Sequence, residues 1–344
     1  MKHQIAALFM ALFLAGKAFA ETAESAADAL AQRPELQAFI SGMVEKYGFE
    51  RTALQAVFRQ VELKPGIISA IGKPAESRKP WDQYRPQFLT PSRIGGGVRF
   101  CSDNAAALAR AQREYGVPEE VIAAIIGVET RYGKQTGSYR VMDALTTLAL
   151  DFPRRAPFFL GELENYLLLA EREGIDPFSL KGSYAGAMGI AQFMPGSYLR
   201  YAVDFDGDGR RDIGHSAADA IGSVANYLAA HGWRPDQPVA VPAQVEGKQY
   251  RALLGVGFDS MRGMGELQQM GVTAAQMPPV DGQAQLLSLE TGSAPEFWLG
   301  FHNFYVITRY NRSVYYAMAV YQLSREIRAM RQQEIGLSAL CRNC

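Results

Sequence analysis

The order of the expected secondary-structure elements restricts the fold of this 344-residue chain more than any other feature. Apolar residues recur with helical spacing from Pro34 onward, and helical patterns occupy most of the chain as far as His231. After Pro238 the pattern changes to short runs that are typical of strands. Because these strands gather near one end instead of alternating with the helices, we expect an α+β fold that is mainly α.

Apolar spacing and the positions of glycine and proline place the individual elements. Helices are expected over residues 34–47, 51–61, 102–115, 154–173 and 216–231, in a segment that starts at Val117, and in a last amphipathic helix that starts at Ser313. Strands are expected at residues 239–241, 285–289 and 305–308. Residues 65–98, rich in proline and glycine, are expected to form an irregular crossover, and residues 181–189 a loop.

The first twenty residues have the features of an export signal. Lys2 and His3 precede an apolar run, Ile5 to Leu14, that is too short to span a bilayer. Ala18-Phe19-Ala20 matches a signal-peptidase site, so we expect cleavage after Ala20, with an uncleaved anchor as the alternative. No cysteine lies near this site, and a lipid-modified N-terminus is therefore not expected.

Composition argues against two classes of function. Lysine and arginine together number 35, as do aspartate and glutamate, so the chain lacks the basic surplus of a nucleic-acid-binding protein. With four histidines and no G-x-S-x-G, Walker or H-E-x-x-H motif, it offers little for a serine hydrolase or a zinc site.

The cysteines indicate at most a small local cross-link. Cys341 and Cys344 form a C-x-x-C pair at the C-terminus, which we expect to be a disulfide in an exported protein. A redox pair or an unpaired tail is the alternative. Cys101 is then an odd thiol, expected to be buried.

A glutamate follows the apolar run Val121 to Ile126, within the motif that extends from Gly127 to Gly133. Desolvation beside apolar surface disfavours the charged form of Glu129 and raises its pKa. A carboxylic acid that is still protonated near neutral pH can donate a proton to a glycosidic oxygen. The alternative is a surface glutamate paired with Arg131 or Lys134.

A segment of small residues from Gly182 to Pro195 has a composition suited to a glycan. Small residues let the backbone approach a ligand closely. Gln192 offers a hydrogen-bond donor and an acceptor, and Phe193 offers a flat face for the C–H face of a sugar. A tight helix–helix contact would also need small residues, but it does not explain Gln192 or Ser183.

Residues 204–212 match the start of an EF-hand calcium loop, with aspartates at relative positions 1, 3, 5 and 9 and glycine at position 6. His215 occupies position 12, where an acid is usual, and Asp219 could close a lengthened loop. A solvated acidic turn is the alternative. Because aspartates held so close without a cation would repel one another, we favour a metal site.

Two further groups carry polar and aromatic side chains. Tyr310, Asn311 and Tyr316 could line a groove, although Asn311 or Ser313 could instead cap the following helix. The pair Arg154-Arg155 could bind an acidic substrate or form the solvated first turn of a helix.

Taken in order, these motifs resemble those of the B family of lytic murein transglycosylases. The resemblance rests on residues 129–133, 186–195, 204–227 and 308–311, and it extends from about Pro34 to about Ile335. It implies a lysozyme-like helical core, an additional α-helical domain and a small β domain. The implied domains are a signal peptide (1–20), an α-helical domain (21–115), a lysozyme-like core (116–235), a β domain (236–312) and a C-terminal helix and tail packed on the α domain (313–344).

The resemblance also implies a reaction and a set of site residues. The reaction is non-hydrolytic cleavage of the β-1,4 bond between N-acetylmuramic acid and N-acetylglucosamine, which leaves 1,6-anhydromuramic acid ends. Glu129 would act as the acid and then as the base. The implied substrate-binding residues are Tyr84, Arg154, Arg155, Ser183, Gln192, Phe193, Tyr227, Tyr310, Asn311 and Tyr316. The implied calcium ligands are Asp204, Asp206, Asp208, the carbonyl of Arg210 and Asp219, in an EF-hand-like loop over residues 204–219.

In one respect the chain departs from the family it resembles, since many members are lipoproteins and this chain lacks the lipid-accepting cysteine, so we expect a soluble periplasmic form. We also expect a monomer that binds glycan strands, with other cell-wall enzymes as candidate partners and no organic cofactor. No second acid stands out beside Glu129, although most glycosidases use two carboxylates. One is sufficient if the substrate supplies the nucleophile. A hydrolytic muramidase, a non-catalytic peptidoglycan-binding scaffold and a calcium-regulated module are the alternative functions.

Overall fold

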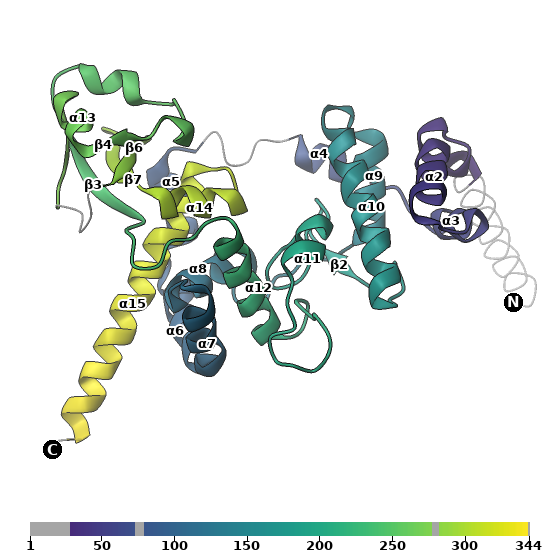
Figure 1. The fold of residues 1–344 in the computed structure, drawn as a ribbon, viewed down its shortest axis with the longest axis horizontal. Coiled ribbons are helices and arrows are strands. Elements are labelled where there is room, and N and C mark those ends of the chain that lie inside the picture. The colour runs from purple at the N-terminus through teal and green to yellow at the C-terminus, as the bar shows by residue number, and fades with distance from the viewer. Residues whose placement is uncertain (1–27, 73–78, 277–281, 343–344) are drawn as a thin grey trace, which may run out of the picture. The chain divides into compact units, whose positions relative to one another are not determined.

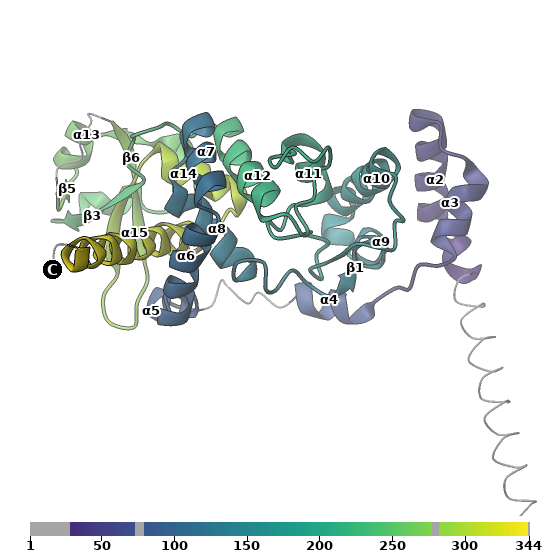
Figure 2. The ribbon, with the colours of Figure 1, turned by 90° about the horizontal axis from the view of Figure 1, so that it is seen from below.

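The computed structural model describes residues 28–72, 79–276 and 282–342, with side chains as far as residue 335 (Figures 1 and 2). The chain divides into two compact units. The described part of the first unit comprises residues 28–72, 138–187 and 194–196, and the second unit comprises the remaining described residues. The predicted signal peptide lies outside the described residues, as do Cys344 and the side chain of Cys341.

The first unit is built from helices. It contains α2 (Pro34–Tyr47), α3 (Arg51–Phe58), α4 (Pro65–Ile71), α9 (Val141–Asp151), η2 (Pro153–Arg155), α10 (Ala156–Glu173) and a two-residue ribbon of β1 (Tyr139–Arg140) and β2 (Lys181–Gly182). α9 lies beside α10 and is covered by α4 (Figure 1). Asp143 of α9 is fully buried, and both its carboxylate oxygens bind the Arg140 guanidinium, at 2.7 and 3.0 Å.

The second unit combines helices with a small sheet. Its helices are α5 (Trp81–Tyr84), η1 (Arg85–Gln87), α6 (Pro91–Asp103), α7 (Ala105–Tyr115), α8 (Glu119–Thr130), most of α11 (Pro195–Tyr201), α12 (Ala217–Ala230), η3 (Gln249–Leu253), η4 (Phe258–Ser260), α13 (Met264–Gln269), α14 (His302–Tyr310) and α15 (Val314–Arg342). Its strands are β3 (Ala240–Val245), β4 (Arg262–Gly263), β5 (Val272–Ala274), β6 (Gln283–Leu289) and β7 (Glu296–Gly300).

The five strands form one antiparallel sheet in the order β4-β6-β7-β3-β5. The sheet has its own apolar core, in which Leu267 of α13 packs with Leu286 of β6 and Leu299 of β7. In β6 the residues Ala284 to Leu287 are all buried, so both faces of this strand are covered. A mainly helical chain whose five-stranded sheet lies after residue 238 agrees with the predicted α+β class.

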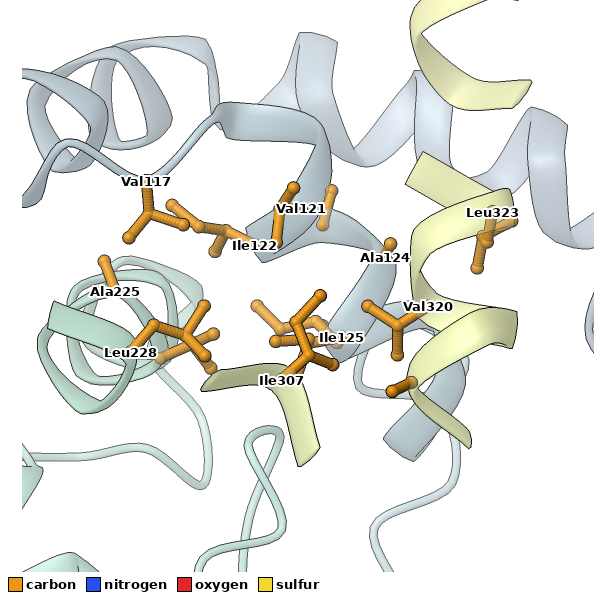
Figure 3. Close-up of a cluster of buried hydrophobic side chains, with 14 of the residues drawn as sticks. Val117, Val121, Ile122, Ala124, Ile125, Ala225, Leu228, Ile307, Val320 and Leu323 are labelled. Atoms are coloured by element: carbon orange, nitrogen blue, oxygen red, sulfur yellow. The ribbon is translucent and has the colours of Figure 1, made fainter. Parts of the chain in front are cut away.

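Helix α8 is the centre of the larger core of the second unit. Every residue from Val121 to Gly127 is buried, as expected for a helix that is apolar on all sides. Figure 3 shows Val121, Ile122 and Ile125 of α8 surrounded by Leu228 of α12, Ile307 of α14 and Val320 of α15. This packing from three other helices fixes the helix whose last turn carries Glu129.

Two predictions of secondary structure are wrong. Residues 305–308 were expected to form a strand but belong to α14, because Phe304 and Ile307 lie three residues apart on one buried helix face. Residues 65–98 were expected to be irregular but contain α4, α5 and the start of α6. Pro65 and Pro91 stand at the first helical position, where proline is favoured.

The other predicted elements are present, with shifts of a few residues at their ends. α2 ends at Gly48, which has φ +73° as a left-handed C-cap, and Ser216 caps α12 by accepting the Asp219 backbone N–H. Cys101 is buried as expected, and burial raises the pKa of its thiol to about 12. In the part of the chain that the structure describes, none of the helices has the length and apolar character needed to cross a membrane.

Candidate active site

Glu129 lies half-buried in the last turn of α8 and is held by a residue far along the chain. The Tyr316 hydroxyl, from the first turn of α15, donates a hydrogen bond to Glu129 Oε1 at 2.6 Å. Burial, and then the negative charge of Glu129, raise the pKa of Tyr316 well above its usual value, so its hydroxyl keeps the proton that it donates. A hydrogen bond to a carboxylate is stronger than one between neutral groups, and it fixes the orientation of the Glu129 side chain.

The end of α8 has an unusual backbone. Arg131 and Tyr132 have φ values of +50° and +62°, and Gly133 follows with +82°. A left-handed conformation costs a non-glycine residue about 1 kcal/mol or more, so this turn needs support from its surroundings. The Tyr132 ring lies so close to Gly127 that an added Cβ there would approach it to 2.6 Å, and its hydroxyl donates to the Arg93 carbonyl at 2.8 Å.

Arg93 of α6 supports the same turn from another side. Its guanidinium donates to the carbonyl of Gly127 at 2.5 Å and to that of Val128 at 3.3 Å. These carbonyls lie at the C-terminal end of α8, where a cation also complements the helix dipole. Arg93 and Tyr132 were not predicted as site residues. Arg93 is in the segment expected to be irregular, and only the G-V-E-T-R-Y-G motif pointed to Tyr132.

An aromatic cluster brings together three of the predicted substrate-binding residues. The Phe193 ring lies 5.6 Å from the Tyr227 ring and 5.9 Å from the Tyr310 ring. The Tyr227 hydroxyl donates to the Arg309 carbonyl at 2.6 Å, and the Tyr310 hydroxyl donates to the Ala191 carbonyl at 2.5 Å. Burial first, and then the negative charge of Glu129, raise the pKa of Tyr310 well above its usual value, so the Tyr310 hydroxyl keeps its proton.

Gln192 and Asn311 are both held by hydrogen bonds to backbone groups. Gln192 has φ +50°, and its side-chain nitrogen donates to the carbonyls of Thr136 and Gly189 at 3.0 and 2.9 Å. Asn311 Oδ1 accepts the backbone N–H of Ser313 at 3.1 Å, and Ser313 Oγ accepts that of Tyr316 at 3.2 Å. Ser313 therefore caps α15, as one form of the alternative predicted, whereas Asn311 binds a backbone N–H that precedes the helix. Contact between Asn311 and a substrate stays a prediction.

Tyr84 lies deeper than a residue that lines an open groove. Only 2% of it is exposed, and its ring packs against Phe88 at 5.0 Å, Tyr315 at 5.6 Å and Trp81 at 6.0 Å. Tyr84 therefore lies in the interior among aromatic rings, and a direct role in substrate binding stays a prediction.

Three predicted substrate-binding residues belong to the first unit. Ser183 Oγ accepts the backbone N–H groups of Ala185 and Ala187 at 3.3 and 3.1 Å, which closes a tight turn. Within this turn Gly186 packs directly against Leu145, so packing does explain that glycine. Arg154 and Arg155 are exposed in η2, and the Arg155 guanidinium lies 4.3 Å from the centre of the Phe158 ring.

The acidic loop gathers three carboxylates. Asp204, Asp206 and Asp219 each offer an oxygen, and these atoms lie within 4.8 Å of one another. Asp219 is fully buried; its Oδ1 accepts the Phe205 N–H at 2.6 Å and its Oδ2 accepts the Asp212 N–H at 2.7 Å. Burial raises the pKa of Asp219. Oxygen ligands of this kind suit a hard divalent cation.

Comparison with known proteins identifies the family. A family model described as "Transglycosylase SLT domain" matches residues 31–325. The chain belongs to this family. It is 45% identical over 312 residues to the membrane-bound lytic murein transglycosylase B of Escherichia coli strain K12, and the match covers 88% of this chain and 85% of that protein. The lytic transglycosylase resemblance seen in the motifs is confirmed.

Solved structures agree with the family assignment. The soluble lytic transglycosylase SltB1 of Pseudomonas aeruginosa is 48% identical, with a TM-score of 0.82 over 87% of this chain and 100% of that one. Slt35 of Escherichia coli, in complex with calcium, is 44% identical, with a TM-score of 0.80 over 87% of this chain and 94% of that one. SltB3 of Pseudomonas aeruginosa, in complex with NAG-NAM-pentapeptide, is 32% identical, with a TM-score of 0.76 over 89% of this chain and 79% of that one. The predicted lysozyme-like α+β fold of a transglycosylase is thereby confirmed.

Proposed function

We propose that this lytic transglycosylase cleaves the β-1,4 bond between N-acetylmuramic acid and N-acetylglucosamine in peptidoglycan and leaves 1,6-anhydromuramic acid ends. The observation that carries the proposal is the carboxylate of Glu129, half-buried at the end of an apolar helix and oriented by the Tyr316 hydroxyl at 2.6 Å. The name of the Escherichia coli relative, a lytic murein transglycosylase, supports peptidoglycan as the substrate.

In the proposed mechanism Glu129 acts first as an acid. Its carboxyl proton goes to the glycosidic oxygen as the bond to C1 of the muramic acid breaks, and N-acetylglucosamine leaves as the alcohol. The Glu129 carboxylate then removes the proton of the muramic O6 hydroxyl while that oxygen attacks C1. The substrate supplies the nucleophile, so no water is consumed and Glu129 ends in its initial protonation state.

The aromatic cluster is the proposed contact surface for the sugar rings beside the reacting bond. Phe193, Tyr227 and Tyr310 pack together, and Gln192 precedes Phe193 on the same short turn. Phe193 and Tyr227 are only 2% and 8% exposed, so their contact with a sugar stays a prediction. The complex of SltB3 with NAG-NAM-pentapeptide supports a glycan that carries a peptide as the ligand. Tyr84, Ser183, Asn311, Arg154 and Arg155 stay predicted contacts, the two arginines near the peptide-bearing sugar.

Digestion of purified sacculi tests the proposed reaction. We expect mass spectrometry to find muropeptides that end in 1,6-anhydromuramic acid, which are lighter by one water than hydrolysis products. Muropeptides with reducing muramic ends would show a hydrolytic muramidase instead. Binding of sacculi without release of any muropeptide would support the non-catalytic scaffold.

Replacement of Tyr316 by phenylalanine tests the support of Glu129. A hydrogen bond to a charged group contributes about 1.5–3 kcal/mol, so we expect kcat to fall about 10- to 100-fold. Tyr321→Phe is the matched control, because it removes another α15 hydroxyl, one that donates to the Ala240 carbonyl at 2.6 Å. Kinetics with both variants would contradict the proposal if Tyr316→Phe kept the kcat of the unmodified protein.

We further propose that the acidic loop binds calcium for structure. Asp204, Asp206 and Asp219 would bind the ion through their carboxylates, together with Asp208 and the carbonyl of Arg210. The calcium complex of Slt35 supports this choice of cation. The ion would neutralise the gathered carboxylates and stabilise the loop, and it takes no part in bond cleavage.

The remaining proposals concern location and organisation. We propose a soluble periplasmic monomer, released after Ala20, whose candidate partners are other cell-wall enzymes. The Escherichia coli relative is named as membrane-bound. The proposal of a soluble protein without a lipid therefore differs from what that name says of the relative. The boundaries at residues 115, 235 and 312 also stay predictions; residues 116–235 contribute to both compact units.

A further inference from the structure

Thr130, the residue after Glu129, is fully buried and has a hydrogen-bond pattern that joins three segments. Its Oγ1 donates to the Ile190 carbonyl at 2.9 Å and lies 3.2 Å from the Ile126 carbonyl one turn back in α8. The same oxygen accepts the backbone N–H of Gly133 at 2.9 Å. One hydroxyl therefore connects the end of α8 both to the turn that follows it and to a distant segment.

The distant segment is the turn Met188–Phe193, which carries predicted substrate-binding residues. Met188 and Phe193 close this turn through two backbone hydrogen bonds, at 2.8 and 3.0 Å. Gln192 and Phe193 lie on it, and the carbonyl of Ala191 accepts the Tyr310 hydroxyl. Ile190, whose carbonyl Thr130 binds, is thus next to the part of the turn that faces the aromatic cluster.

The Thr130 hydroxyl also binds the left-handed turn that follows α8. Arg131, Tyr132 and Gly133 all have positive φ, and such a turn persists only where other groups hold it. Thr130 supplies two of its hydrogen bonds, since its hydroxyl accepts the Gly133 N–H and its carbonyl accepts the Gln135 N–H at 2.9 Å. Glu129 immediately precedes Thr130.

From these contacts we propose that Thr130 is a positioning residue, which sets the place of the Glu129 carboxylate relative to the Gln192–Phe193 end of the turn. The inference rests on the proposed function, in which Glu129 transfers the proton and the turn binds the glycan. Thr130 itself is buried and would not touch the substrate. Loss of its hydroxyl should therefore slow the reaction of bound glycan more than it weakens binding, because a small displacement of an acid costs turnover.

The test compares three substitutions in the full chain. Thr130→Val keeps the shape of the side chain and removes the hydroxyl, while Thr130→Ser keeps the hydroxyl. Thr147→Val is the matched control. Thr147 is also a fully buried helical threonine, whose Oγ1 donates to the carbonyl four residues back at 2.7 Å and accepts the Lys64 N–H at 2.9 Å. Thr147 belongs to α9 and has no part in the proposed site.

We expect Thr130→Val to lower kcat about 10- to 100-fold with KM changed less than about threefold. Thr130→Ser should keep kcat within about threefold of the unmodified protein. Thr147→Val should lower the melting temperature as Thr130→Val does, but leave kcat unchanged. An unchanged kcat in Thr130→Val, an equal loss of kcat in Thr147→Val, or a loss in Thr130→Ser as large as in Thr130→Val would overturn the proposal.

A further variant and a product analysis complete the experiment. Thr130→Ala, which places no extra methyl beside the Ile190 carbonyl, serves if the valine variant does not fold, and a kcat equal to that of the unmodified protein would again overturn the proposal. Product analysis of the same digests separates this inference from the proposed function. Reducing ends from the unmodified protein would refute the transglycosylase chemistry, whereas the kcat of the Thr130 variants judges positioning alone.

Discussion

Glycan cleavage by Glu129→Gln is expected to be at least about 10³-fold slower than cleavage by the unmodified protein. Positioned acid–base catalysis contributes about 10²- to 10⁴-fold, and here one carboxyl group serves both proton transfers. Glutamine has the same shape, and its amide oxygen can still accept the Tyr316 hydroxyl that now lies 2.6 Å from Oε1. The substitution therefore removes the exchangeable proton with little change in packing.

The measurement is the rate of anhydromuropeptide release from sacculi, together with sacculus binding and the melting temperature. We expect binding and melting to stay close to those of the unmodified protein. Glu119→Gln is the control on the same helix, because Glu119 pairs with Arg331 at 2.9 Å near the start of α8. Its removal should leave the rate unchanged. A Glu129→Gln variant that digests sacculi at the normal rate would show that the catalyst lies elsewhere.

The position of Glu129 could be predicted because the information is local. The run Val121 to Ile126 is apolar on every side, so its helix had to be buried, and a glutamate in its last turn had to lie at the edge of a core. The end of α2 at Gly48 could likewise be predicted from a single residue. In each case the feature depends on residues within one or two helical turns.

The support around Glu129 could not be predicted in this way. Tyr316 stands 187 residues later in the chain, and no local pattern relates it to α8. Arg93 came from a segment where prolines were interpreted as breaks, although Pro91 begins a helix there. Residues 305–308 favour a strand by composition, because β-branched and aromatic residues are common in strands, but packing in the core around α8 overrides that preference.

The left-handed turn after α8 is a further feature that the local sequence does not predict. Positive φ is usually signalled by glycine, yet Arg131 and Tyr132 adopt it before Gly133 does. Only the surroundings explain it: Tyr132 packs against Gly127 and Thr130 supplies hydrogen bonds to the turn. Local preference is overruled next to the proposed catalytic residue, which is where such conflicts are expected in enzymes.

Calcium is expected to raise the melting temperature of the unmodified protein, and Asp219→Asn to remove that effect. A cation at 100 times its dissociation constant stabilises the folded state by about 2.7 kcal/mol, if it does not bind the unfolded chain. For a chain of 344 residues that gain is a rise of about 4 °C in the melting temperature. The physical source is relief of repulsion between the carboxylates of Asp204, Asp206 and Asp219, which lie within 4.8 Å.

Variants of Asp219 and Asp206 separate two sources of stability in this loop, which are its internal hydrogen bonds and its bound calcium. Asp219 is buried and accepts the N–H groups of Phe205 and Asp212, so asparagine there leaves a buried donor facing an N–H group. We expect Asp219→Asn to lose about 1–3 kcal/mol even with chelator, in addition to the calcium response. Asp206 is exposed, so Asp206→Asn should melt normally in chelator and lose only the response to calcium. Melting curves of the unmodified protein that coincide in calcium and in chelator would contradict a bound ion, and a full calcium response in both variants would place it outside this loop.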